Sequence, residues 1–397
     1  MDLKIMTDDI EQAALDQITT LASIPAFENS KIRIMPDVHA GKGCVIGFTA
    51  DMEDKIIPNV VGVDIGCGML TVDLGKQTFT FPELEEAIQN KVPSGMNVNS
   101  ERIAMFPKLQ ELYCYGYLKD TNRLERSIGT LGGGNHFIEI DKDEEGNSYL
   151  VIHSGSRNLG KQVAEFYQGL AADLMNSGAE LKKQQEELIA EYKAQGKVRG
   201  IQSALRKLYK EFEEKNPKLP ADLCYLSGKW SEEYLHDMRI CQEYATLNRQ
   251  TMAYSIISEL DLDIEDQFET IHNYIDFNSN IIRKGAVSAK KGERLLIPIN
   301  MKDGCIYGVG KGNEDWNCSA PHGAGRVMSR MQARENISLN DFVLSMKGIY
   351  SESISEETID ESPFAYRSID KIIDKIEPTV EVRKLMKPVY NFKAKEW

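Results

Sequence analysis

Apolar residues in the first 75 positions change from a helical spacing to short extended runs. Residues 8–22, DDIEQAALDQITTLA, place apolar side chains three or four positions apart, which predicts an amphipathic helix. From about residue 31 to 75 the apolar residues form the runs KIRIMP, CVIGFTA and MLTVDLG, which are separated by glycine-rich loops. Runs of this kind are typical of β-strands.

The rest of the chain mixes the same two patterns. Residues 136–155, HFIEIDKDEEGNSYLVIHSG, predict two strands around an acidic turn. From about residue 159 to 260 the chain has a charged pattern with helical spacing. Strands are expected again near 281–310, followed by a helix after GAGR and an irregular tail. Because no repeat or linker divides the chain, we predict one α+β domain over residues 1–397, with a helical subdomain at about 159–260.

Composition and charge then narrow the class of protein. With 42% hydrophobic and 27% charged residues, this chain of 397 residues is typical of soluble globular proteins. No apolar run approaches the ~20 residues of a membrane span and the N-terminal segment is acidic, so we expect a cytoplasmic protein without membrane contact. Seven irregularly spaced cysteines favour free thiols in a reducing compartment. The net charge of −14 argues against a general nucleic-acid coat.

Histidines carry the first chemical signal. Five of the six lie in short segments beside glycine or asparagine, namely His39, His136, His153, His272 and His322. The segment VGVDIGCGML sets Asp64 and Cys67 among glycines, so we expect both side chains to be presented to a ligand and not buried. Imidazole, thiolate and carboxylate are transition-metal ligands. Since the sequence has no CxxC or HxxxH pair, a scattered catalytic centre, able to hold two bridged metal ions, is favoured over a structural zinc site.

A second signal points to phosphate. The chain has no GxxxxGK[ST] motif, which excludes a P-loop. In LGGGNHF, however, three glycines leave backbone amides free to meet anionic oxygens. HSGSRN and HGAGR each place an arginine four residues after a histidine, where its guanidinium can bind a phosphate group. The repeated pattern favours phosphate chemistry over two unrelated structural ion pairs.

The chain resembles the RtcB-type RNA ligases from about residue 31 to 393. The segments that carry the resemblance, in the order found in that family, are MPDVHAGKG, VGVDIGCGM, LGGGNHFIE, VIHSGSRN, HNY, RKGA and SAPHGAGRVMSR. The resemblance implies mixed β-sheets around a central metal site, with a helical insertion. It also implies that an RNA 3′-phosphate or 2′,3′-cyclic phosphate end is joined to a 5′-hydroxyl end, using GTP and two Mn²⁺ ions through a histidine that carries GMP. RNA is the implied partner, and an archease-like activator is a candidate partner.

The resemblance also assigns residues. Its implied metal ligands are Asp64, Cys67, His136, His153 and His272, with Cys67 as the bridge. Its implied catalytic residues are the nucleophile His322, Asp37, which holds that histidine, and Arg326, which contacts phosphate. Its implied nucleotide contacts are Asn135, Glu139, Tyr366 and Lys393, the last with Lys395 as an alternative. Its candidates for RNA or transferred phosphate are Arg157, Arg249 and Lys284.

One departure and two alternative functions stay open. Asn300 in IPINM stands where many members have a serine near the nucleotide; it could still donate a hydrogen bond. This departure suggests a divergent subgroup used for RNA repair and not for tRNA splicing. A two-metal phosphoesterase or nuclease acting on RNA ends would use the same metal ligands, and a non-catalytic RNA-binding protein could be stabilised by them. The HGAGR segment argues against both alternatives.

Overall fold

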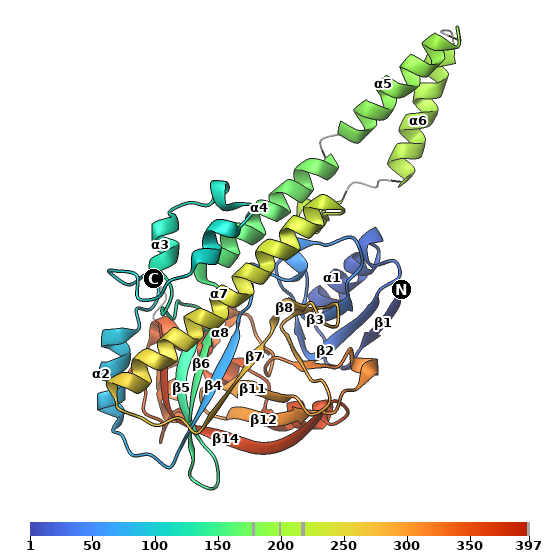
Figure 1. Ribbon diagram of the computed structural model, residues 1–397. Helices are drawn as coiled ribbons and strands as arrows, with labels where there is room; N and C mark the ends of the chain where they lie inside the picture. Colours follow the sequence, from blue (N-terminus) through green and yellow to red (C-terminus); the bar gives the residue numbers. More distant parts are fainter. Residues whose placement is uncertain (177–178, 198–199, 216–218, 395–397) are drawn as a thin grey trace.

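The computed structural model describes residues 1–176, 179–197, 200–215 and 219–394 (Figure 1). Mixed β-sheets and helices together form the body, so the predicted α+β class is confirmed. Among the described residues, no helix is both long and apolar enough to cross a membrane. The proposed division into one ligase domain with a helical subdomain stays a prediction.

The largest sheet has seven strands and positions the candidate site. Its strands, in spatial order, are β11 (Arg294–Asn300), β12 (Gly304–Gly310), β14 (Val380–Lys393), β5 (Phe137–Lys142), β6 (Ser148–Ser154), β4 (Gly68–Gly75) and β7 (Asp266–Ile271). Every neighbouring pair in this sheet is antiparallel. As a result, the starts of β4 and β5 lie at the same edge of the sheet as the ends of β6 and β7.

Two further sheets complete the strand inventory of the described residues. The five-stranded sheet has the order β1 (Asp2–Ile5), β2 (Lys31–His39), β3 (Ile46–Asp51), β9 (Ile281–Lys284) and β8 (Asn273–Asp276). Its β1–β2 pair is parallel, and its other pairs are antiparallel. The small sheet pairs β10 (Ala286–Ser288) with β13 (Ser319–Pro321).

The helices lie around these sheets. They are α1 (Gln12–Ala22), α2 (Phe81–Lys91), α3 (Thr121–Arg126), α4 (Arg157–Asn176), α5 (Ala179–Ala194), α6 (Ile201–Lys215), α7 (Lys229–Glu259), α8 (Arg330–Asn336), α9 (Leu339–Ser345) and α10 (Ile369–Ile376). The α5–α6 pair projects away from the body, whereas α7 crosses the body diagonally over the sheet (Figure 1). Helices α4 to α7 agree with the helical pattern predicted for about 159–260.

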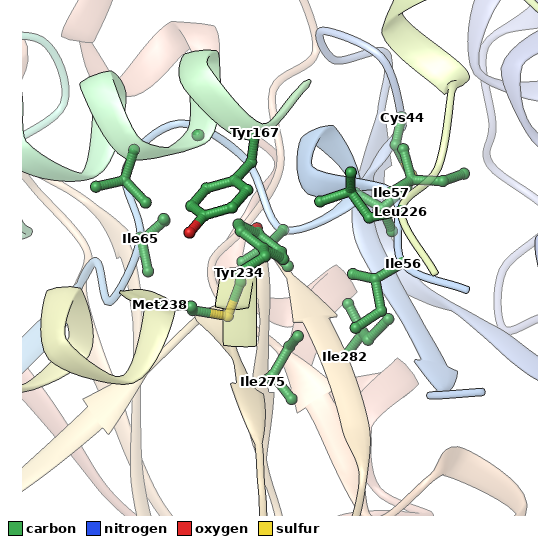
Figure 2. Close-up of a cluster of buried hydrophobic side chains, with 14 of the residues drawn as sticks. Cys44, Ile56, Ile57, Ile65, Tyr167, Leu226, Tyr234, Met238, Ile275 and Ile282 are labelled. Carbon is green, nitrogen blue, oxygen red and sulfur yellow. The ribbon is translucent and has the colours of Figure 1, made fainter. Parts of the chain in front are cut away.

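Helix α7 packs against both large sheets through its buried apolar side chains. Near its start, Tyr234 and Met238 meet Tyr167 of α4 and the strand residues Ile275 and Ile282 (Figure 2). Its later turns pack against the inner strands β4 and β6 of the seven-stranded sheet. Burial of these side chains fixes how the two sheets lie relative to each other.

The prediction of an irregular tail at the end of the chain is wrong. Residues Val380–Lys393 form β14, which pairs with β12 along its first half and with β5 along its second half. Pro388 inside this segment argues against a strand, because proline lacks the N–H that a ladder needs. The structure accommodates Pro388 at a register shift between Pro388 and Tyr390. The other predicted strands and the helices at 8–22 and after GAGR are present.

Replacing Gly68 by alanine is expected to destabilise the protein. A Cβ atom there would lie 2.6 Å from the carbonyl oxygen of Thr270 on β7, so β4 and β7 would have to separate. Overpacking of this kind costs about 1–3 kcal/mol. We expect a lower urea midpoint for Gly68→Ala, measured by circular dichroism. Gly169→Ala, on the exposed face of α4 with no atom within 4 Å of its Cβ, should keep or raise the midpoint. Equal midpoints for the two variants would contradict this account.

Candidate metal centre and adjoining pocket

The predicted metal ligands meet at one edge of the seven-stranded sheet. Cys67 directly precedes β4, His136 directly precedes β5, His153 lies near the end of β6, and His272 follows β7. The strand register aligns these ends, because Gly68 pairs with both Ser154 and Ile271, and Phe137 pairs with His153. Sheet order, therefore, brings together residues more than 200 positions apart.

The contacts within this ligand cluster are short. The Cys67 Sγ atom lies 3.3 Å from His153 Nε2 and 3.5 Å from His136 Nε2. His136 Nε2 lies 3.0 Å from Asp64 Oδ2, and His153 Nε2 lies 3.4 Å from His272 Nε2. We define the ligand cluster as these five side chains. Their nitrogen, sulfur and oxygen atoms face a common space.

Backbone carbonyls set the tautomers of two of these histidines. Nδ1 of His136 donates to Leu131 O over 2.9 Å, and Nδ1 of His153 donates to Asn135 O over 3.2 Å. A carbonyl oxygen can only accept, so in the neutral rings the Nε2 lone pairs point into the cluster. Burial and the charge of His136 hold the pKa of His153 well below its usual range. Burial and the neighbouring His322 and His153 lower the pKa of His272 in the same way.

The donor set fits a metal ion. His272 Nδ1 is buried without a hydrogen-bond partner, so in either neutral tautomer one buried ring nitrogen of His272 is unsatisfied. Converging lone pairs repel one another unless a cation lies between them. Carbonyl-bound imidazoles with a free Nε2, joined by a thiol and a carboxylate, are the arrangement that transition metals require.

The expectation that Cys67 is not buried is wrong, because this residue is 3% exposed, whereas the Asp64 side chain is 29% exposed. The surrounding glycines serve close packing instead: a Cβ on Gly68 would strike β7, and a Cβ on Gly155 would lie 2.1 Å from Asp64 Oδ1. Burial and the charge of Asp64 raise the pKa of the Cys67 thiol well above its usual value. A thiolate at this position therefore needs a cation beside it.

Arg249 lies beneath the ligand cluster and is fully buried on α7. Its guanidinium donates to Gly66 O over 2.7 Å, to Ser154 O over 2.8 Å and to Glu269 Oε1 over 2.9 Å. Gly66 precedes Cys67 and Ser154 follows His153, so Arg249 joins the two segments that carry these ligands. The side chain does not line the pocket described below.

The other two predicted phosphate contacts also meet the backbone. Arg157 donates to Thr130 Oγ1 over 3.2 Å and to Gly95 O over 3.3 Å. Lys284 donates to Lys42 O over 2.7 Å and to Asn59 O over 3.0 Å, and burial lowers its pKa. Neither residue lines the pocket. Their assignment to RNA or transferred phosphate, like that of Arg249, stays a prediction.

His322 lies beside the ligand cluster, with its ring centroid 4.9 Å from that of His272. Its Nδ1 lies 2.6 Å from Asp37 Oδ2, and its backbone N–H donates to the same oxygen over 3.1 Å. Asp37, on β2, is fully buried, whereas the His322 side chain is 18% exposed. Because the carboxylate accepts the Nδ1 proton, the Nε2 lone pair of His322 is left free.

A cavity of about 230 Å³ opens beside His322 and the ligand cluster. We call this cavity the pocket. The predicted site residues that line it are Asn135, Glu139, His153, His272, Asn300, His322, Arg326, Tyr366 and Lys393. His39 also lines it and contacts Asp37 O through Nδ1 over 2.9 Å. The pocket thus connects the ligand cluster with most of the predicted nucleotide contacts.

Glu361 was not predicted from the sequence, although it joins several pocket residues. Its Oε2 accepts from Lys393 Nζ over 2.7 Å and from the Tyr366 hydroxyl over 2.8 Å, and its Oε1 lies 3.4 Å from Arg326 Nη1. Burial alone would raise the pKa of Glu361, but Lys393 and Arg330 outweigh it, so the pKa is lowered. Nothing in the segment IDESPFAY marks this glutamate, because only the fold surrounds it with cations.

Asn300 makes its hydrogen bonds within its own turn. The Asn300 Oδ1 atom accepts from the backbone N–H groups of Lys302 and Asp303, both over 2.9 Å, and its Nδ2 donates to Asp303 Oδ2 over 2.9 Å. Asn300 therefore shapes the β11–β12 turn at the pocket wall. Lys393 lies in the pocket wall, and the alternative Lys395 lies outside the described residues.

Fold and site together define an α+β protein with a buried candidate metal centre that opens into a pocket with a carboxylate-bound histidine. The family model described as "tRNA-splicing ligase RtcB" matches residues 17–394, and the chain belongs to the RtcB family. "RNA-splicing ligase RtcB1" of Escherichia coli strain ATCC 25922 is 31% identical, over 94% of this chain and 92% of its own length. "RNA-splicing ligase RtcB" of Escherichia coli strain K12 is 30% identical over the same shares. "tRNA-splicing ligase RtcB" of Archaeoglobus fulgidus is 26% identical, over 92% and 87%.

Replacing Cys67 by serine is expected to remove bound metal and leave the fold intact. Serine has nearly the same shape but is a poorer ligand that rarely ionises, so the transition metal bound per chain should fall by more than half. Metal content is measured by plasma mass spectrometry after gel filtration, and folding by circular dichroism. Cys318→Ser, which changes a half-buried thiol outside the ligand cluster, should keep the metal content. A Cys67→Ser protein with unchanged metal content would remove Cys67 from the centre.

Proposed function

We propose that this protein is an RNA ligase that joins a 3′-phosphate or 2′,3′-cyclic phosphate end to a 5′-hydroxyl end, with GTP and Mn²⁺, in tRNA splicing or RNA repair. Membership of the RtcB family and the names of the relatives support the ligase class. The observation that carries the proposal is the His322–Asp37 pair beside the ligand cluster. RNA is the proposed partner, an archease-like activator is a candidate partner, and the cytoplasm is the proposed location.

His322 is the proposed nucleophile. With its Nδ1 proton donated to Asp37, Nε2 attacks the α-phosphorus of GTP, the bond from that phosphorus to the bridging oxygen breaks, and pyrophosphate leaves. The product is a histidine–GMP phosphoramidate, and the positive charge on the ring is stabilised by the buried Asp37 carboxylate. Asp37 therefore fixes both the tautomer and the orientation of the ring, as the acid of a catalytic triad does.

The RNA steps follow from that intermediate. An oxygen of the RNA 3′-phosphate attacks the phosphorus of the adduct, the N–P bond breaks, and His322 recovers its lone pair. The 5′-hydroxyl then attacks the activated 3′-phosphate, and GMP leaves. Asp64, Cys67, His136, His153 and His272 would hold the two proposed Mn²⁺ ions. When bound, these ions would neutralise the charge of the phosphoryl groups.

The pocket supplies the proposed nucleotide contacts. Arg326 and Asn135 are proposed to bind phosphate, and Glu139, Tyr366 and Lys393 to bind guanine, with Asn300 in the adjoining wall. Lys393 and Arg326 both contact Glu361. GTP bound by these two cations would share or replace the contacts that Glu361 makes with them. The contacts with Glu361 keep both cations ordered before GTP binds.

The alternative of a two-metal phosphoesterase or nuclease would use the same ligand cluster. Such an enzyme activates water and forms no covalent adduct, so it would not require a histidine held by a buried carboxylate. A non-catalytic RNA-binding protein would not require that pair either. The His322–Asp37 geometry therefore favours the ligase.

His322→Ala is expected to abolish the covalent GMP adduct and the joining of 3′-phosphate to 5′-hydroxyl ends. The variant should still seal RNA supplied with a pre-activated 3′ end, RNA–(3′)pp(5′)G, because that substrate bypasses the first step. The adduct is measured with α-labelled GTP and Mn²⁺ after denaturing electrophoresis, and sealing with labelled RNA.

Two further variants make this test specific. His236→Ala, on α7 outside the pocket, should keep both reactions. His136→Ala should lose both reactions, since the metal ions serve every step. Labelling of the His322→Ala protein would show that another residue is the nucleophile. Absence of label on the wild-type protein would favour the phosphoesterase.

A further inference from the structure

A second buried cluster lies behind the pocket wall. Glu139 and Asp141 are two positions apart on β5 and therefore share one face of the strand, and Cys305 of β12 packs against them. One ligand atom of each side chain lies within 4.8 Å of the others, and all three residues are buried. Of the three, only Glu139 lines the pocket.

Neither oxygen of Asp141 has a hydrogen-bond partner within the part of the chain that the structure describes. The relative exposure of this residue is 0%. Among the described residues, the charged and titratable groups nearest to this face already have other partners: Lys393 Nζ contacts Glu361, the hydroxyl of Tyr149, beside Asp141 on β6, contacts Asp143, and the Cys305 thiol donates to Glu139 Oε1 over 3.9 Å. An ionised Asp141 would be an uncompensated buried charge next to Glu139, which the protein avoids by retaining a proton.

The proton position follows from the surroundings of the two carboxyl groups. Glu139 Oε2 accepts from Asn391 Nδ2 over 2.6 Å, so Glu139 has a donor that stabilises its ionised form. Asp141 has none. Burial and the charge of Glu139 raise the pKa of Asp141 well above its usual value, while burial raises that of Glu139 against the opposing effects of Asp141, Asn391 and Lys393. One proton shared by the pair therefore resides on Asp141.

We propose that Asp141 is a positioning residue: as a neutral acid it donates a hydrogen bond to Glu139 and, with Asn391, holds that carboxylate as a fixed acceptor facing the pocket. The inference rests on the proposed binding of GTP in this pocket. Asp141, Asn391 and Cys305, whose Sγ lies 3.9 Å from Glu139 Oε1, then occupy three of the lone-pair positions of Glu139, and the remaining one is available to an N–H donor on the guanine edge. Adenine presents an acceptor nitrogen there, so a fixed carboxylate selects guanine.

The test compares three variants for covalent labelling at varied GTP and ATP concentrations. Asp141→Ala should raise the GTP concentration for half-maximal labelling about tenfold and reduce the preference for GTP over ATP by a similar factor, which is the effect of losing one buried hydrogen bond. Its labelling rate at saturating GTP should stay within about threefold of wild type. Asp141→Asn, which keeps the shape and an N–H donor without a titrating proton, should match wild type.

Asp143→Asn serves as the matched control. It makes the same acid-to-amide change two positions away, at a carboxylate that contacts Lys384 and Tyr149 outside the pocket. This variant should keep the half-maximal GTP concentration. Thermal unfolding of every variant separates loss of stability from loss of nucleotide affinity, because a purely structural role would lower the unfolding midpoint without changing base preference.

Several outcomes would overturn the inference. An Asp141→Ala protein with wild-type half-maximal GTP concentration and base preference would make Asp141 a bystander. An Asp141→Asn protein as impaired as Asp141→Ala would show that charge, and not hydrogen-bond donation, is what matters. Loss of one metal ion per chain in Asp141→Asn would make the cluster a metal site. If the wild-type protein itself is not labelled by GTP, the proposed function is contradicted. This result differs from a labelled wild-type protein with an unaffected Asp141→Ala variant, which contradicts only the inference about Asp141.

Discussion

Metal-ligand atoms that face one another with too few protons to join every pair are the constraint on which this structure depends. His136 and His153 each use Nδ1 to bind a backbone carbonyl, so their Nε2 atoms face the Cys67 sulfur at 3.5 and 3.3 Å. The single S–H proton of Cys67 can bond only one of these two nitrogens at a time, so one lone pair stays unsatisfied, whereas a cation would satisfy both. The rest of the fold keeps these atoms from moving apart. A preorganised site of this kind binds metal without first paying to order its ligands.

That restraint comes from backbone pairing and from one arginine. The strands β5, β6, β4 and β7 are neighbours, so a shift of one register position would turn a ligand to the opposite face of the sheet. Arg249 adds a cross-link between the carbonyls of Gly66 and Ser154, which flank two of the ligands. Because Arg249 lies on α7, and α7 also packs against the five-stranded sheet, the core in Figure 2 and the metal centre share one rigid element.

The sequence carries the chemistry of the site better than its architecture. Histidine, cysteine and aspartate in glycine-rich segments predict metal ligands because these residue types have few other reasons to occur there, and the structure brings those five side chains together. The burial of Cys67 could not be predicted, since glycines permit either exposure or close strand packing. Glu361 and Asp141 are ordinary acids in the sequence, and their character depends on neighbours that only the fold supplies: Lys393 contacts Glu361 from 32 positions away, and Cys305 packs against Asp141 and Glu139 from another strand. Strand β14 was not predicted; it contains Pro388, and its second half is almost continuously buried and shows no alternation.

The place of β14 in the sheet has a consequence for how the protein is made. This strand is the last described element of the chain, yet it lies between β12 and β5 in the middle of the seven-stranded sheet. While the chain emerges from the ribosome, the two flanking parts of the sheet have no partner along the line where β14 will lie. Each therefore exposes an open strand edge, the kind that recruits wrong partners. Insertion of β14 closes both edges in one event and delivers Asn391 and Lys393 to the pocket, so the nascent protein acquires this part of the pocket wall and its protection from aggregation together.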